Sequence, residues 1–291
     1  MGRRPMGSDP INDFSGMRTV PLRLAPALRV EAVISRNDPV GGANRRLCVR
    51  PPSWPVSQPG QFVMLSPGAV TAVRSDDPLL PRPMAIFRES GGADPEVEIL
   101  YKVEGRGTAL LADASVGDRV RVVGPLGQPF PLPSPGEHVV IVGGGTGVAS
   151  LYGLVARAAA GVRQTVVLGA RSADDLMARD DFERTAATLL FTSEDGSLGE
   201  QGLVTDPLAR LLAVGDVATI YCCGPTPMMR ACSELAREHD VPCVVSLENN
   251  MACGYGVCLG CAVPRPAGDY ALVCRDGPVF DASQIAWDGL A

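Results

Sequence analysis

Histidine is nearly absent from this chain. Only His138 and His239 occur among the 291 residues, one before an expected strand and one at the end of an expected helix. Neither has the spacing of a metal site or a catalytic triad, so neither is assigned a role. Any catalysis must therefore depend on other side chains or on bound cofactors.

The sequence also lacks an excess of basic residues and any long apolar run. Its 32 acidic and 26 basic side chains give a formal charge of −6, which predicts neither a nucleic-acid nor a membrane partner. The apolar runs, such as the one ending at Ile141–Val142, are too short to cross a bilayer. Residues 1–19 are polar and contain no secretory signal, which predicts a flexible tail and a cytoplasmic protein.

Cysteine is present in an odd number, nine, which argues against a disulfide framework. Cys253, Cys258 and Cys261 have the spacing C-x4-C-x2-C, and Cys274 follows after a further twelve residues. This is the plant-type pattern of a [2Fe–2S] cluster, in which a wrapping loop supplies three thiolates and a later strand the fourth. The glycines between these cysteines allow the unusual backbone angles of such a loop.

Zinc is the alternative for these four cysteines, because four thiolates also suit a tetrahedral zinc ion. Zinc sites usually contain two C-x2-C pairs, whereas here only Cys258 and Cys261 form such a pair. The spacing therefore favours the cluster. The remaining cysteines are expected to be small apolar core residues: Cys48, Cys222, Cys223, Cys232 and Cys243.

The organisation of the chain predicts a β-barrel followed by an α/β domain. Residues 20–133 contain short apolar runs separated by Pro and Gly pairs, as in a small antiparallel barrel. Within 134–246, strand and helix signals alternate, which predicts a doubly wound parallel sheet. Residues 247–291 are loop-like and rich in cysteine, and we expect them to form a cluster subdomain.

Two loops in the α/β part suit a nucleotide. The strand Val139–Val142 leads into a glycine loop and then a helix, where free N–H groups favour a pyrophosphate. Val148 stands where the dinucleotide fingerprint has its third glycine, so a plain tight turn remains the alternative. A second loop between strand and helix contains Cys223, Gly224 and Pro225, and ligands bind at such strand ends. The glycine loop consists of Gly143, Gly144, Gly145, Thr146 and Gly147.

These motifs together resemble the ferredoxin–NADP reductase superfamily. Arg82-Pro83-Met84-Ala85 is similar to its flavin-binding R-P-x-S/T motif, and Tyr101 with Gly105-Arg106-Gly107-Thr108 resembles its second flavin-binding element. The glycine loop and Cys223-Gly224-Pro225 resemble its two nucleotide elements. The resemblance implies an FAD-binding barrel and an NAD-binding α/β domain.

The C-terminal residues narrow the resemblance. Ser246-Leu247-Glu248, Met251-Ala252-Cys253-Gly254 and the residues from Cys274 to Phe280 are similar to electron-transfer subunits of NAD-dependent dihydroorotate dehydrogenases. The resemblance covers nearly the whole chain after residue 20 and favours the cluster over zinc. It implies a function in pyrimidine biosynthesis, in which electrons pass from a dihydroorotate-oxidising FMN subunit through [2Fe–2S] and FAD to NAD. It also implies a heterotetramer with that catalytic subunit.

The resemblance assigns roles to individual residues and leaves some alternatives open. Arg82 would pair with the FAD pyrophosphate. Tyr101 would contact the flavin, or be a half-buried strand aromatic. Cys223 would lie near the nicotinamide as the catalytic residue, or be a core thiol. Gly105, Gly107 and Thr108 would receive phosphate, or form a plain turn.

Three further points remain open in the sequence. Ala85 stands where the flavin motif usually has a hydroxyl, so one hydrogen bond to the flavin is missing. Arg171 follows the second strand of the α/β part, where an acidic residue would bind a ribose, so the choice between NAD and NADP rests on the resemblance. The rival functions are a related flavin and iron–sulfur reductase with another redox partner, and a zinc-stapled binding module.

Overall fold

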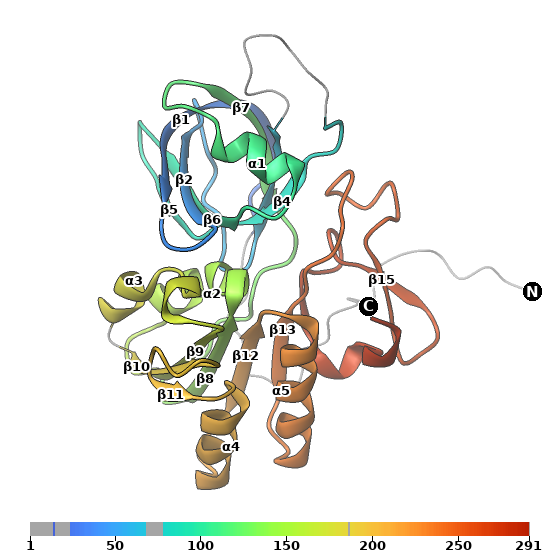
Figure 1. Ribbon diagram of the computed structural model, residues 1–291. Helices are drawn as coiled ribbons and strands as arrows, with labels where there is room; N and C mark the ends of the chain where they lie inside the picture. Colours follow the sequence, from blue (N-terminus) through green and yellow to red (C-terminus); the bar gives the residue numbers. More distant parts are fainter. Residues whose placement is uncertain (1–13, 15–23, 68–77, 186, 291) are drawn as a thin grey trace, which may run out of the picture.

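The structure is a computed structural model that describes residues 14, 24–67, 78–185 and 187–290. The flexible tail predicted for residues 1–19 thus lies outside the described residues, apart from Phe14. Figure 1 shows a curled sheet at the top, a layered domain below it and a C-terminal lobe at one side. The chain therefore builds three parts in sequence order.

The first part is an antiparallel sheet with the strand order β4-β3-β7-β1-β2-β6-β5. It curls so that β4 also lies against β6, which gives the predicted barrel-like shape (Figure 1). Alternate residues face opposite sides of a strand, so in β6 Val97, Ile99 and Tyr101 join the barrel core while Leu100 packs against the second domain. The elements are β1 Leu28–Pro39, β2 Asn44–Arg50, β3 Phe62–Ser66, β4 Arg82–Ala85, β5 Arg88–Ser90, β6 Glu96–Lys102, α1 Arg106–Ala112 and β7 Arg119–Leu126.

The second part is a sheet with the order β11-β10-β9-β8-β12-β13-β16. The chain runs outward from β8 to β9 and β10 and then returns to β12, so the direction of winding changes between β8 and β12. The strands are β8 His138–Gly144, β9 Arg163–Ala170, β10 Thr188–Ser193, β11 Glu200–Gln201, β12 Thr219–Cys223, β13 Cys243–Ser246 and β16 Val279–Asp281. The helices are α2 Val148–Ala156, α3 Arg179–Glu183, α4 Thr205–Val214 and α5 Thr226–Glu238.

Both faces of this sheet are covered, as expected for continuous apolar strands. In β8, Val139 and Ile141 pack with α2 and α3, whereas Val140 and Val142 pack with α4 and α5. This is the layered arrangement of a doubly wound fold. One strand departs from the prediction of a wholly parallel sheet, because β16 pairs antiparallel with β13.

The C-terminal lobe contains a small hairpin of β14 Ala262–Pro264 and β15 Tyr270–Leu272. Its buried residues belong to the same core cluster as Val140 and Val142 of the central sheet. The lobe returns to that sheet through β16. It is therefore packed onto the second domain rather than attached by a flexible linker.

Candidate cofactor and cluster sites

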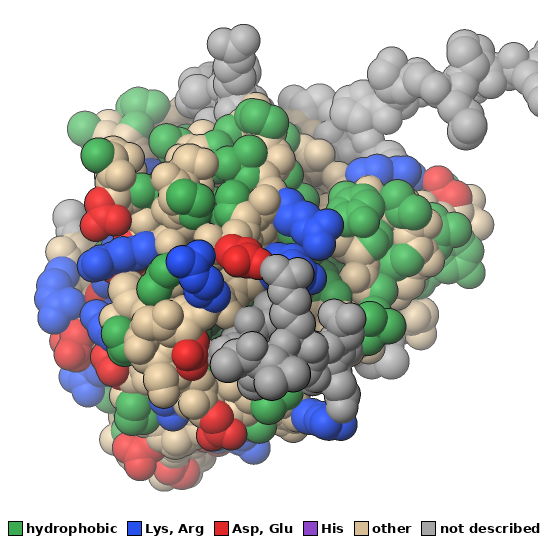
Figure 2. Space-filling model, turned by 90° about the horizontal axis from the view of Figure 1, so that it is seen from above, with side chains coloured by type: hydrophobic (Ala, Val, Ile, Leu, Met, Phe, Trp, Pro, Cys, Tyr) green, Lys and Arg blue, Asp and Glu red, His purple; other side chains and the backbone are tan. Residues whose placement is uncertain are grey.

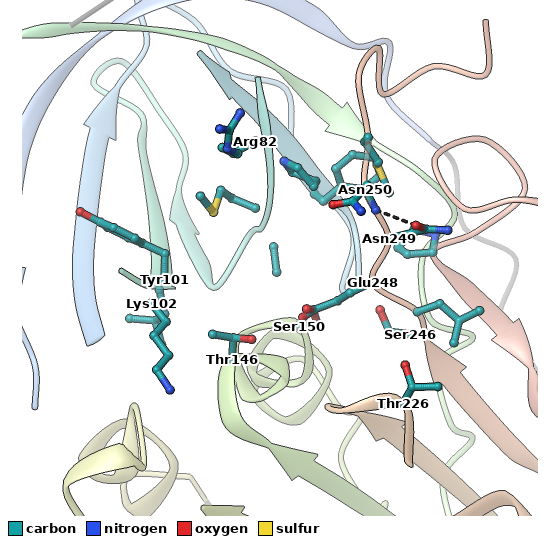
Figure 3. A pocket seen from close by; sticks show the side chains of 18 of the residues that line it. Arg82, Tyr101, Lys102, Thr146, Ser150, Thr226, Ser246, Glu248, Asn249 and Asn250 are labelled. Atoms are coloured by element: carbon teal, nitrogen blue, oxygen red, sulfur yellow. Dashed lines mark hydrogen bonds between the residues drawn. The ribbon is translucent and has the colours of Figure 1, made fainter. Parts of the chain in front are cut away.

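A cavity of about 540 Å³ opens between the barrel, the start of α2 and the chain that follows β13. The predicted flavin residues Arg82, Pro83, Met84, Ala85, Tyr101 and Thr108 all line it. Figure 3 shows that it is also bordered by polar side chains from the other two parts, among them Thr146, Ser246 and Asn250. A group bound here would touch all three parts of the molecule.

Arg82 lies over the start of α1. Its Nη1 donates a hydrogen bond to the Leu80 carbonyl at 2.6 Å. A Cβ atom added to Gly107 would lie 2.6 Å from the Arg82 Nε, so only glycine admits the guanidinium this close to the helix. The predicted element of Gly105, Gly107 and Thr108 thus stands beside Arg82, where a guanidinium and backbone N–H groups can share a phosphate.

The Thr108 hydroxyl is used within its own loop. It accepts hydrogen bonds from the backbone N–H groups of Glu104 at 3.0 Å and Gly105 at 3.1 Å, and it donates to the Gly105 carbonyl at 2.9 Å. These bonds fix the turn that begins α1. Gly105 itself does not line the cavity, so its contribution is to the shape of this turn.

Tyr101 borders the cavity but is almost completely buried in the barrel core. Its hydroxyl donates to the Asn37 Oδ1 at 3.1 Å and points away from the cavity in Figure 3. Burial raises the pKa of Tyr101 to about 12, so the phenol is neutral. This environment is that of a strand aromatic with a satisfied hydroxyl, the alternative to direct flavin contact.

A second cavity, of about 680 Å³, lies over the carboxyl ends of β8, β9, β10 and β12. It is lined by Gly144, Gly145 and Thr146 from the first predicted loop and by Gly224 and Pro225 from the second. This is the position at which doubly wound sheets bind ligands. Gly143 and Gly147 do not line the cavity and serve packing instead.

The two predicted nucleotide loops contact each other through their backbones. A Cβ atom on Gly147 would lie 2.5 Å from the Cys223 carbonyl carbon and 2.6 Å from the Gly224 nitrogen. Similarly, a Cβ atom on Gly144 would lie 2.5 Å from the Met228 Sδ. Glycine is thus required at Gly147 by close packing, because its φ of −60° is accessible to any residue.

The two cavities meet and form one cleft. The residues that line both are Lys102, Glu104, Thr146, Thr226 and Glu248. In Figure 3, Thr146, Ser150 and Glu248 stand together at the edge of the first cavity. Ligands in the two cavities would therefore touch at this junction, which is the requirement for direct hydride transfer between them.

Glu248 is an ionisable residue at the junction that sequence reasoning did not assign to a site. Its side chain is exposed to the open cleft, although the protein surrounds it on most sides. Burial, together with the Glu104 carboxylate, raises the pKa of Glu248 above its usual value of 4.5. The residue follows β13 in the Ser246-Leu247-Glu248 motif, but only the packing of the three parts brings it to the cleft.

Cys223 lies beneath this junction and lines neither cavity. The side chain is fully buried, and its Sγ donates to the Ser246 carbonyl at 3.3 Å. Burial and the nearby Glu248 raise the pKa of the Cys223 thiol to about 12. With this pKa, Cys223 is a neutral thiol at the base of the junction.

Ion pairs centred on the buried Asp181 hold the barrel against the second domain. Asp181 of α3 pairs with Arg46 of β2 and, at 3.2 Å, with Arg88 of β5. Glu98 of β6 bridges the same two arginines at 2.9 and 3.1 Å. Arg46 and Asp181 are 135 positions apart in the sequence. These ion pairs fix the relative position of the two cavities.

The four predicted cluster cysteines lie in the C-terminal lobe as two pairs. The Sγ atoms of Cys261 and Cys274 are 3.3 Å apart and buried. Cys253 is partly exposed and hydrogen-bonds to the side chain of Cys258, which is exposed. Within the described residues, no group of three His, Cys, Asp or Glu side chains is arranged so that it could hold a single metal ion.

This paired arrangement fits a binuclear cluster better than one zinc ion. A mononuclear structural zinc needs four ligands around a single point, whereas each iron of a [2Fe–2S] cluster takes two cysteines. Backbone N–H groups also point at the sulfurs, from Gly256 to Cys274 at 3.1 Å and from Tyr255 to Cys253 at 3.5 Å. Such hydrogen bonds are typical of iron–sulfur ligands.

The two pairs of cysteines differ in their thiol pKa values. Although burial alone would raise it, backbone N–H groups lower the pKa of the Cys253 thiol to about 6. Burial and the neighbouring Cys261 raise the pKa of Cys274 to about 12. Two thiolates as close as Cys261 and Cys274 repel each other unless a cation lies between them.

Comparison with known proteins gives the family. The family model described as "Iron-sulfur cluster binding domain of dihydroorotate dehydrogenase B" matches residues 248–286, and "Oxidoreductase NAD-binding domain" matches residues 141–234. A probable dihydroorotate dehydrogenase B (NAD(+)) electron transfer subunit from Methanopyrus kandleri is 44% identical, over 81% of this chain and 82% of that protein. The Desulforamulus reducens subunit of that name is 39% identical, over 79% and 87%. This chain belongs to the family of dihydroorotate dehydrogenase B electron transfer subunits.

Solved structures of other proteins share the fold of this chain. A chain from an NADH-dependent reduced ferredoxin–NADP oxidoreductase, described for flavin-based electron bifurcation, has a TM-score of 0.75 and 31% identity over 88% of this chain and 90% of that one. The ferredoxin reductase of carbazole 1,9a-dioxygenase has a TM-score of 0.64 at 20% identity, which shows the fold alone. The predicted ferredoxin-reductase-like fold is confirmed. In the described residues, no helix is long and apolar enough to span a membrane.

Proposed function

We propose that this chain is the electron-transfer subunit of an NAD-dependent dihydroorotate dehydrogenase. It would carry electrons from a dihydroorotate-oxidising FMN subunit to NAD in the cytoplasm, as part of pyrimidine biosynthesis. The observation that carries this proposal is the single cleft formed by two cavities, with paired cysteines in the adjoining lobe. When bound, FAD exchanges a hydride with a nicotinamide and single electrons with an iron–sulfur cluster.

The first cavity would hold FAD. Arg82 would bind its pyrophosphate together with the loop of Gly105, Gly107 and Thr108, while Pro83, Met84 and Ala85 would line the isoalloxazine ring. Tyr101 would support this wall from the barrel core. Residues 20–133 would thus form the FAD-binding domain.

The second cavity would hold NAD, and residues 134–246 would form its domain. The backbone of Gly144, Gly145 and Thr146 would receive the pyrophosphate, with Gly224 and Pro225 opposite. Gly143 and Gly147 would allow the two loops to approach. Cys223, as a neutral thiol, would form the base of the junction on which the nicotinamide ring lies.

The C-terminal subdomain, residues 247–291, would hold the [2Fe–2S] cluster through Cys253, Cys258, Cys261 and Cys274. Its exposed loop would face the catalytic subunit, because Tyr255, Val257 and Leu259 are 60, 74 and 63% exposed around Cys258. Exposed apolar groups of this kind mark protein contacts. Hydrophobic side chains gather on the right of Figure 2, over the C-terminal lobe.

The cofactor assignment is tested by visible absorption spectra of the purified, air-oxidised protein before and after anaerobic addition of NADH. Flavin bands with additional thiolate-to-iron absorption, both bleached by NADH, are the expected result. Zinc without iron or acid-labile sulfide, in protein that also fails to reconstitute with iron and sulfide, would refute the redox function.

The partner assignment is tested by co-expression with an FMN-containing dihydroorotate dehydrogenase subunit and by a variant of the exposed loop. Val257→Glu should weaken co-purification of the two subunits and dihydroorotate-dependent reduction of NAD, while NADH still bleaches the flavin. Val214→Glu is the matched control, because Val214 is 73% exposed at the end of α4, outside the cluster lobe. Equal co-purification of both variants with the catalytic subunit would contradict this docking surface. The wild-type chain is expected to assemble with that subunit into a heterotetramer.

A further inference from the structure

The second cavity has two distinct ends. At one end it shares Thr146, Thr226 and Glu248 with the first cavity, and at the other it is bordered by Arg171 after β9 and Glu194 after β10. This step rests on the proposed function: a nicotinamide must reach the flavin to within about 3–3.5 Å for hydride transfer. The nicotinamide then occupies the shared end, and the adenosine ribose occupies the end with Arg171 and Glu194.

The cations near this cavity are already paired. The Arg171 Nε lies 3.7 Å from the Asp175 carboxylate. Lys102 lies 3.9 Å from Asp175 and 4.0 Å from Glu104. Among the described residues that line the cavity, each cation therefore already has a carboxylate within 4 Å, so none is left unpaired for a phosphate. This lining contains four carboxylates and two cations.

Glu194 is different, because its carboxylate has no cation within 4 Å among the described residues. The backbone on both sides of its side chain is fixed. The Glu194 N–H donates to the Ala170 carbonyl at 3.2 Å, and its carbonyl accepts from the Gln201 Nε2 at 3.2 Å. A carboxylate beside a ribose can accept a hydrogen bond from a hydroxyl group, and it repels a phosphate.

We propose that Glu194 is the residue that selects NAD(H) over NADP(H). Its carboxylate accepts a hydrogen bond from the 2′-hydroxyl of the adenosine ribose and repels the 2′-phosphate at the same position. Asp175 contributes by pairing with Arg171, the residue that would otherwise bind that phosphate. Glu194, which follows β10, thus takes the role of the acidic residue that is missing after β9, where Arg171 stands.

The test measures binding of ADP-ribose and 2′-phospho-ADP-ribose to the holoprotein by calorimetry, which requires no turnover. The wild-type protein should bind ADP-ribose with at least tenfold preference. Glu194→Gln should reduce this preference about tenfold, because a single like-charge contact is removed, and Glu194→Arg should reduce it further. Glu200→Gln is the matched control, because Glu200 is exposed, pairs with Arg210 and does not line the cavity.

Two results would overturn the inference. One is a change in preference for Glu194→Gln no larger than that for Glu200→Gln. The other is a loss of affinity for 2′-phospho-ADP-ribose by more than tenfold in Arg171→Ala, since Arg171 would then bind the phosphate. NADH bleaching of the flavin in the same preparations separates these failures from a failure of the proposed function, which would show as no bleaching by NADH or NADPH.

Discussion

Replacement of Gly147 by alanine should separate the two nucleotide loops. The new Cβ atom would lie 2.5 Å from the Cys223 carbonyl carbon, whereas ordinary contacts of this kind are 3.4–4 Å long. The obstacle is backbone at the end of β12, in the middle of the sheet, so it cannot rotate away as a side chain could. The loops must therefore move apart by roughly 1 Å.

The magnitude follows from this displacement. Overpacking of a rigid interior costs about 1–3 kcal/mol. For a protein of this size, 2 kcal/mol corresponds to a fall in Tm of roughly 4–8 °C. A misplacement of about 1 Å at a reacting pair can cost on the order of 10²-fold in rate, so kcat/KM for NADH should fall by that order.

Gly153→Ala is the matched control for Gly147→Ala. Gly153 lies in α2, the helix that follows Gly147, and a Cβ atom there would be at ordinary contact distance, 3.6 Å from Pro59. In a helix this change should raise stability by roughly 0.5–1 kcal/mol. The assays are thermal unfolding of the FAD-loaded protein and NADH-dependent reduction of ferricyanide. If Gly147→Ala has a Tm and kcat/KM no lower than those of the wild type, the backbone contact does not limit the site.

Three further predictions concern other contacts. Asp181→Asn should cost about 2–3 kcal/mol, because the largely buried Arg46 then keeps only Glu98 as a charged partner, and thermal unfolding should show Tm lower by roughly 4–12 °C. Because the pKa of Glu248 is raised in the folded protein, its protonated form stabilises the fold below pH 4.5, and this stabilisation is lost as the pH rises through the raised pKa. Glu248→Gln should therefore unfold at a higher temperature than the wild type at pH 8 but not near pH 4. Gly254→Ala should slow reduction of the cluster by NADH in stopped-flow absorption, because its Cβ would lie 2.5 Å from the Met64 Cγ, whereas Gly268→Ala, with a similar φ and open space, should not.

The sequence predicted the parts of this protein well because its signals are local. Short apolar runs separated by Pro and Gly pairs predicted the barrel, and alternating strands and helices predicted the α/β domain. The spacing of Cys253, Cys258 and Cys261 depends only on a short loop. The glycine loop was recognisable for the same reason, although Gly147 proved to be needed for packing against Cys223 rather than for lining the cavity. Even β16 was missed for a local reason, since three residues carry too little periodicity to predict a strand.

What the sequence could not show is how these parts face one another. Glu248 looks like an ordinary surface carboxylate until the barrel, the sheet and the segment after β13 are assembled around it. The pairing of Arg46 with Asp181 has no sequence pattern, because it depends on the orientation of two domains. From the sequence alone, Arg171 was a candidate for binding a 2′-phosphate, but the structure places the Asp175 carboxylate beside it.

The relative positions of the three redox sites are therefore set by the interfaces between the parts rather than by the binding motifs. Asp181 and its arginines lock the barrel to the sheet on one side, and Arg157 does so on another through the Ser57 carbonyl at 2.6 Å and Glu89 at 3.0 Å. The cluster lobe shares a core with the sheet. Because hydride transfer tolerates little misplacement, a change at these interfaces should impair transfer between sites while each site still binds its own ligand. Motif residues should show the opposite pattern, with ligand binding lost first.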